Sequence, residues 1–212
     1  MSRRLPVYIL LDTSGSMSGE PIQAVESGMQ MLVSELRRDP QALETAYLSV
    51  ITFDSSANQI VPLTELTAFQ MPSLKANGTT ALGEALSLLA KKINSEVTKT
   101  TMEQKGDWKP LIFIFTDGQP TDSWQNGLAD LKKCKTGIIV ACAAGTGADT
   151  SVLQQITEVV VKLDTASADD IKQFFKWASA SVSASSAKID SSGSEPSGID
   201  SLPPPPPVIT IL

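Results

Sequence analysis

The sequence predicts an α/β fold, a doubly wound (Rossmann-like) and mostly parallel sheet of about six strands with helices on both faces. Four short, nearly continuous apolar runs rich in Val, Ile and Phe indicate strands buried on both sides, at residues 5–11, 47–53, 111–115 and 137–143. Segments with helical periodicity separate most of these runs. Because strand and helix alternate along the chain, parallel pairing is the expected arrangement.

Each remaining element follows from its own pattern. The helix expected over residues 22–36 has its apolar side chains on one stripe, at Val25, Met29, Leu32, Val33 and Leu36. A second helix, over residues 82–97, has the same period, at Leu82, Leu86, Leu89, Ile93 and Val97. Residues 59–66 follow the second strand after a short loop and are expected to pair with it as one antiparallel edge strand. We expect further helices at 124–134, 152–159 and 168–183, and a last strand at 159–163.

The composition changes near residue 184. We therefore assign residues 1–184 to one domain and residues 185–212 to a Ser/Pro-rich tail, which is rich in Ser, Gly and acidic residues and includes the proline run 203–207. Prolines favour an extended polyproline conformation. The tail is either a solvated spacer or a segment that docks in a groove, and the sequence leaves both open.

Charge and residue usage exclude several functions. The 212 residues contain 17 Lys and Arg against 23 Asp and Glu, a formal net charge of −6, so we expect no nucleic-acid partner. The chain has no histidine, which rules out Ser-His and Cys-His nucleophile pairs and His-ligated zinc. Cys134 and Cys142 are expected to be reduced thiols of a cytoplasmic protein. No apolar run approaches the ~18 residues of a membrane span, and the start lacks the flanks of a signal peptide.

Oxygen-bearing side chains follow two of the predicted strands and precede one helix. Asp12, Ser14 and Ser16 lie on a tight turn directly after the first strand, and Asp117 follows the strand at 111–115. A turn with two adjacent threonines, Thr79 and Thr80, leads into the helix at residue 82. The doubly wound topology would bring all three places to the same edge of the sheet.

Two carboxylates and several hydroxyls, with no nitrogen or sulfur ligand, suit a hard cation. Mg²⁺ prefers oxygen ligands and usually keeps some of its waters, which leaves a coordination position for an outside group. A partner's Asp or Glu carboxylate could take that position. Mn²⁺ and Ca²⁺ are alternatives for the same oxygen set.

These motifs, in this order and on these elements, resemble the von Willebrand factor A (VWA) domain and its metal-ion-dependent adhesion site (MIDAS). Asp12, Ser14 and Ser16 match the D-x-S-x-S motif, and Asp117 in FTDGQPTD matches the second aspartate. Thr80 matches the motif threonine, three positions before Gly83, with Thr79 as the fallback. The resemblance implies a binding module that is not an enzyme, in which Mg²⁺ is completed by an acidic residue of the partner.

Within this superfamily, the start RRLPVYILLDTSGSMSGEPI is similar to the TerY-type proteins of bacterial tellurite-resistance loci. That similarity implies a role in a tellurite or chemical-stress resistance complex. Proteins encoded nearby, such as a kinase, a phosphatase or TerD-type proteins, are the partners it implies.

Two other functions stay open at this stage. An aspartate at the tip of a first strand is also how phosphoaspartyl transferases begin, so Asp12 could be a nucleophile beside Mg²⁺. The hydroxyl-rich tail could alternatively make the chain a phosphorylation-regulated scaffold.

Several residues near the motifs have structural explanations. We expect Thr116 to pack at a strand end, Asp122 to cap the helix that begins at Trp124, and Trp108 and Trp124 to pack in the core or at its edge. Glu20 and Asp54 are expected to be solvated loop charges.

Overall fold

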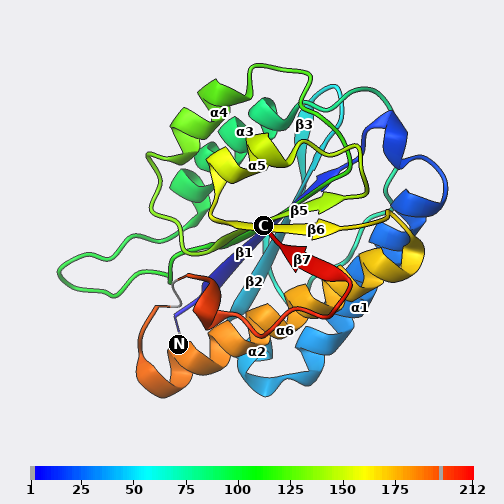
Figure 1. The fold of residues 1–212 in the computed structure, drawn as a ribbon. Coiled ribbons are helices and arrows are strands. Elements are labelled where there is room, and N and C mark those ends of the chain that lie inside the picture. Colours follow the sequence, from blue (N-terminus) through cyan, green and yellow to red (C-terminus); the bar gives the residue numbers. More distant parts are fainter. Residues whose placement is uncertain (1–2, 196–197) are drawn as a thin grey trace.

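The computed structural model describes residues 3–195 and 198–212, which form a central sheet with helices on both faces (Figure 1). Within these residues the sheet has seven strands, in the order β3-β2-β1-β4-β5-β6-β7. The strands are β1 (Leu5–Asp12), β2 (Ala46–Phe53), β3 (Ala57–Glu65), β4 (Leu111–Thr116), β5 (Ile139–Ala144), β6 (Val159–Leu163) and β7 (Ile209–Ile211). β1, β2, β4, β5 and β6 are parallel, whereas β3 and β7 are antiparallel at the two edges. The predicted fold class is confirmed.

The helices divide into two groups that bury the two faces of the sheet (Figure 1). One face is covered by α1 (Glu20–Arg38), α2 (Pro40–Thr45) and α6 (Ala168–Ser192), and the other by α3 (Leu82–Glu96), α4 (Trp124–Leu131) and α5 (Thr150–Ile156). Every residue of β1 is buried, as its apolar sequence predicts. Its side chains alternate between the two cores, so Val7, Ile9 and Leu11 face α1 and α6 while Tyr8 and Leu10 face α3.

The centre of the sheet is the topological switch point. β1 lies between β2 and β4, and the chain crosses to opposite sides of β1 to form these two neighbours. Leu11 pairs with Phe115, so the ends of β1 and β4 lie at the same level. Ligands of open α/β sheets bind at the carboxyl ends of the strands at such a point.

The C-terminal part departs from the prediction. The helix expected to end at Ser183 continues as α6 to Ser192, because its buried face continues through Val182, Ser185 and Ile189. The expected boundary at 184/185 therefore lies inside a helix. Beyond it the chain returns along the fold: the Trp177 indole Nε1 donates to the Pro203 carbonyl at 2.8 Å, and β7 adds to the edge of β6. Of the two alternatives for the tail, the structure shows docking.

Among residues 3–195 and 198–212, no helix combines the length and the apolar character that a bilayer crossing requires.

Candidate metal centre

Asp12 is the last residue of β1, and its carboxylate is held on both oxygens. The Ser14 amide donates to Oδ1 at 2.8 Å, and the Thr116 hydroxyl donates to Oδ2 at 2.5 Å. The side chain is fully buried. Burial raises the pKa of Asp12, the hydrogen bonds from Ser14 and Thr116 partly oppose that rise, and the nearby Asp117 charge adds to it. A bound cation would favour the ionised form of this carboxylate.

A line of short oxygen contacts links the turn after β1 to the turn after β4. The Ser14 and Ser16 hydroxyl oxygens lie 3.0 Å apart, and the Ser16 hydroxyl donates to Asp117 Oδ1 at 2.7 Å. Residues more than a hundred positions apart in the sequence thus meet through side-chain oxygens. This is the juxtaposition that the doubly wound topology predicts.

The turn after β1 is fixed by the backbone around it. The Gly15 amide donates to the Gly78 carbonyl at 3.1 Å, and the Asn77 amide donates to the Thr13 carbonyl at 2.8 Å. A Cβ at Gly15 would lie 3.3 Å from that same Gly78 oxygen, so a glycine permits the close approach. Met17, fully buried in the short 3₁₀ turn Gly15–Met17, anchors the turn to the core.

Thr80, and not Thr79, lies against the turn that carries Asp117. Thr80 is 6% exposed, and a Cβ built on Gly118 would lie 3.3 Å from its hydroxyl oxygen, which places that oxygen against the turn that follows Asp117. Thr79 is exposed, and its amide and hydroxyl both point to the Ser55 hydroxyl, at 3.2 and 3.4 Å. The geometry favours Thr80 over the fallback.

The threonine turn is positioned by a residue that the sequence analysis did not single out. The Thr80 amide donates to the Thr121 hydroxyl at 3.1 Å, and the Thr121 amide donates back to the Thr80 carbonyl at 2.9 Å. This pair ties the turn before α3 to the loop after β4. No sequence pattern predicts this long-range pair, because both partners are threonines in loops and carry no motif of their own.

The five predicted site residues fit a hard divalent cation by donor chemistry. Asp12 and Asp117 bring carboxylates and Ser14, Ser16 and Thr80 bring hydroxyls, all at one edge of the sheet. Oxygen-only sets of this kind suit Mg²⁺, Mn²⁺ or Ca²⁺. In the part of the chain that the structure describes, no group of three or more His, Cys, Asp or Glu side chains is placed to hold a metal. A cation site here depends on the hydroxyls.

Asp122 caps a helix, as predicted, but the prediction named the wrong helix. The Asp122 carboxylate accepts from the amides of Gly83 at 2.9 Å and Glu84 at 2.8 Å, so it caps α3 and not the helix that begins at Trp124. The α3 N-terminus supplies unpaired amides that are close in space, although 39 positions away at Gly83. Trp108 is buried and Trp124 packs against the core beside α3, as expected.

Thr116 does more than pack at a strand end, because its hydroxyl bond to Asp12 orients the carboxylate. Glu20 is exposed in the first turn of α1. Asp54 is half-buried and caps its own loop by accepting from the Ser56 amide at 3.1 Å.

The fold and the site together define the class of protein. It is an α/β domain with a doubly wound sheet, and the carboxylates and hydroxyls at its switch point suit a divalent cation. A family model described as the von Willebrand factor type A domain matches residues 7–182. The chain belongs to this family.

Known proteins are similar to the chain in sequence or in fold. An uncharacterized Synechocystis protein, sll0103, is 36% identical over 124 residues, which is 55% of this chain and 26% of that protein. A structure of proximal thread matrix protein 1 from the mussel byssus, with a zinc-occupied MIDAS motif, aligns with a TM-score of 0.61 at 22% identity over 82% of this chain and 44% of that chain. A von Willebrand factor type A structure from Catenulispora acidiphila aligns with a TM-score of 0.62 at 14% identity, covering 84% of this chain and 43% of that one. The chain thus spans about a quarter of the Synechocystis protein and less than half of these solved chains.

Proposed function

We propose that the chain is a metal-dependent protein–protein interaction module. Asp12, Ser14, Ser16, Thr80 and Asp117 would hold a divalent cation, Mg²⁺ in the first place with Mn²⁺ or Ca²⁺ as alternatives. The observation that carries the proposal is the line of oxygen contacts from Ser14 through Ser16 to Asp117, beside the buried carboxylate of Asp12.

The charge balance of the donor set explains why an acidic partner fits. Two carboxylates at most neutralise a divalent cation, and a cation that one of them holds only through water keeps positive charge, which attracts a further carboxylate. The three hydroxyls add donors without adding charge. When bound, the cation supplies a Lewis-acidic position that a carboxylate can occupy. The partner would therefore present an Asp or Glu side chain. The zinc-occupied MIDAS motif of the mussel protein supports a divalent cation at this position of the fold.

The surroundings of Asp12 argue for binding without catalysis. A phosphoaspartyl enzyme needs an accessible carboxylate oxygen as its nucleophile. Asp12 is fully buried and each of its oxygens already accepts one hydrogen bond, from Ser14 or Thr116, so neither oxygen is exposed to a phosphoryl substrate. We therefore expect no turnover at this site. The remaining lone pairs of Asp12 can still hold a cation, directly or through water.

The cellular setting that we propose rests on the resemblance of the N-terminal motif to TerY-type proteins. In this setting the chain would act in the cytoplasm, in a bacterial tellurite or chemical-stress resistance complex. A kinase, a phosphatase or TerD-type proteins would supply the acidic residue.

The test separates metal binding from partner choice. Calorimetric titration with Mg²⁺ and Mn²⁺ first establishes cation binding by the wild type and its loss in Asp117→Ala. Capture of a purified TerD-type protein is then measured in Mg²⁺ and in EDTA, with Thr79→Ala as the control. Capture that is lost in EDTA and in Asp117→Ala, but kept by Thr79→Ala, supports the proposal. Capture that survives both treatments contradicts it.

A further inference from the structure

A basic cavity lies at the opposite end of the sheet from the candidate metal centre. Its volume is about 570 Å³, and it lies between the end of α3, the loop that leads to β4 and the residues that precede β5. Five basic side chains and two acidic ones line it, although acids outnumber bases in the whole chain. The basic residues are Arg3, Lys99, Lys109, Lys133 and Lys135.

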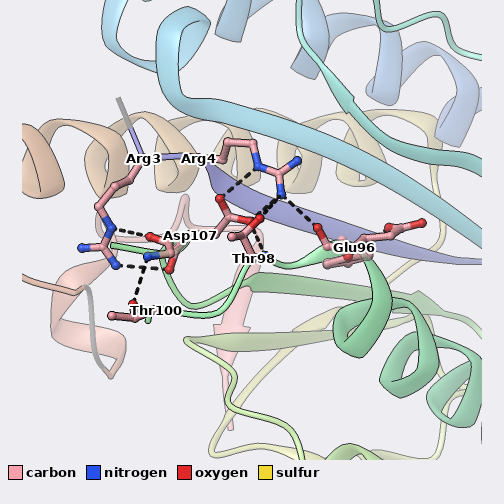
Figure 2. Close-up of polar contacts among 8 residues, drawn as sticks. Arg3, Arg4, Glu96, Thr98, Thr100 and Asp107 are labelled. Atoms are coloured by element: carbon pink, nitrogen blue, oxygen red, sulfur yellow. Dashed lines mark hydrogen bonds and ion pairs between the residues drawn. The ribbon is translucent and has the colours of Figure 1, made fainter. Parts of the chain in front are cut away.

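One of the two acids does not offset this positive charge. Asp107 is paired with Arg4, which is outside the cavity lining, by two hydrogen bonds of 2.9 and 2.6 Å (Figure 2). Asp107 Oδ2 also accepts from the Thr98 amide at 2.7 Å and so closes the base of the loop. The Asp107 carboxylate is thus neutralised by Arg4 in the cavity wall and does not offset the basic side chains of the lining.

Arg3 is held in place before any ligand arrives. Its guanidinium lies 3.6 Å from the centre of the buried Trp108 ring. It also donates to the carbonyls of Gly106 at 2.6 Å and Asp107 at 3.2 Å, and Figure 2 shows these polar contacts. These contacts use Nε and Nη2, which leaves Nη1 for an anion. A guanidinium stacked and fixed in this way loses little freedom on binding.

The loop that carries Lys99 is also fixed at its base. A Cβ at Gly106 would lie 2.3 Å from the Thr98 carbonyl, so glycine is needed where the loop closes. Lys99 and Lys135 are exposed, and no hydrogen bond or ion pair to the described residues engages either ammonium group. Lys133, by contrast, is paired with Asp130 at 2.9 Å. Two ammonium groups therefore remain available at the cavity.

The chain already seats one peptide carboxylate at this cavity. Glu195, in the hydroxyl-rich and acidic segment after α6, pairs with Lys109 at 2.6 Å. The two side chains are 33% and 46% exposed, so the pair is a weak one that a ligand can replace. Lys109 precedes β4 whereas Asp117 follows it, so this acid of the tail does not complete the candidate metal centre of its own chain.

We propose that this cavity is a second recognition site, which binds an extended acidic peptide segment of a partner protein through carboxylates. Arg3, Lys99 and Lys135 would contact the acidic side chains, and Glu195 would be an internal competitor at Lys109. Burial raises the pKa of the Cys134 thiol in the cavity wall, in keeping with a binding site and not a nucleophilic one. The site is independent of the cation at the other end.

Fluorescence anisotropy tests this proposal with the full chain and a labelled peptide, Gly-Ser-Glu-Glu-Ser-Glu-Glu-Ser-Gly, beside its Gln counterpart. The variant K99E/K135E is compared with K172E/K176E, which makes the same charge change at exposed lysines of α6 outside the cavity. We expect the acidic peptide to bind in EDTA, and the cavity variant to weaken binding about tenfold more than the control variant. Glu195→Gln should tighten binding about twofold, since it removes the competitor.

Three results would overturn the proposal. They are no binding of the acidic peptide, equal weakening by the cavity and control variants, and inorganic phosphate that binds as tightly as the peptide and displaces it. The last result would assign the cavity to a small anion. Thermal unfolding of each variant confirms that the chain is folded in every titration.

Discussion

The two ends of the sheet are built from opposite chemistry. At the carboxyl ends of β1 and β4, acids and hydroxyls meet on short turns, with Asp12 fully buried, Asp117 half-buried and Ser16 exposed. At the other end, five basic side chains line a cavity, and all of them except the half-buried Arg3 are exposed. In the functions proposed above, the first end would recognise a carboxylate through a cation, and the second would do so directly. Chelation should therefore affect only the first, and salt mainly the second.

The structural demands of the two ends differ as well. A cation needs its oxygens held closely, and the turn contacts of Gly15 and the hydrogen bonds to Asp12 provide that order. An ammonium group needs only to approach its anion, so Lys99 and Lys135 can remain exposed on loops. A cation would thus require fixed oxygen positions at the first end, whereas an acidic peptide would require only flexible lysine side chains at the second.

The largest effect is expected at Asp12. Asp12→Asn removes a charge that no neighbouring hydroxyl replaces, so Mg²⁺ affinity should fall by at least about 100-fold while the chain stays folded. Calorimetric titration and thermal unfolding measure the two properties. Binding of the acidic peptide at the other end should not change. A variant with the wild-type Mg²⁺ affinity would contradict the site assignment.

Removing the Arg4–Asp107 ion pair beside the basic cavity should lower the stability of the fold and leave the affinity for Mg²⁺ unchanged. Arg4→Ala leaves the Asp107 carboxylate, whose side chain is 6% exposed, without its ion-pair partner. We expect the free energy of unfolding to fall by about 2 kcal/mol in urea denaturation, with unchanged Mg²⁺ affinity. Arg38→Ala is the control, because Arg38 pairs with Glu35 on the surface. Equal effects of the two variants would show that the Arg4 pair adds nothing to the fold.

The docked tail predicts a smaller loss. Ending the chain after Leu202 removes the carbonyl that accepts from Trp177, the pairing of β7 with β6 and the buried side chain of Ile209. The free energy of unfolding should fall by about 1–2 kcal/mol in urea denaturation. A stability equal to that of the full chain would show that these contacts contribute nothing in solution.

Most of the fold could be predicted from the sequence because its central strands are short, nearly continuous apolar runs. The D-x-S-x-S motif could also be recognised in the sequence, because Asp12 follows such a run directly and Ser14 and Ser16 come at alternate positions after it. Strand β7 could not be predicted from the sequence. Its three residues after a proline run are too few to show an alternating apolar pattern, and its partner β6 lies far away in the sequence. The sequence alone therefore could not decide whether the tail is a solvated spacer or a docked segment.

Side-chain partners were harder to predict than elements. Asp122 was assigned to the nearest helix along the chain, whereas the amides that it caps belong to α3. The short helix α2 was missed, although Asp39 before Pro40 is a capping pattern and its carboxylate accepts from the amides of Gln41 and Ala42. The basic cavity could not be predicted, since its lysines and arginine are scattered over residues 3–135.

The raised pKa of Asp12 predicts a small pH effect with a definite sign. In EDTA, the folded chain favours the protonated carboxyl more than the unfolded chain does, so this contribution to stability is complete below the ordinary pKa near 3.8 and is lost as pH rises through the folded value. Asp12→Asn cannot ionise. The melting temperature of the variant relative to the wild type should therefore rise with pH across that window. A flat or falling difference would show that burial of this charge does not oppose folding.

The most direct test of a cation held by this cluster is a matched pair of threonine variants. Mg²⁺ and Mn²⁺ titrations are measured by calorimetry on the wild type, Thr80→Ala and Thr79→Ala. We predict cation binding by the wild type, about tenfold weaker binding in Thr80→Ala, and affinity within about twofold of the wild type in Thr79→Ala. No binding by the wild type, or a greater loss in Thr79→Ala than in Thr80→Ala, would contradict the account.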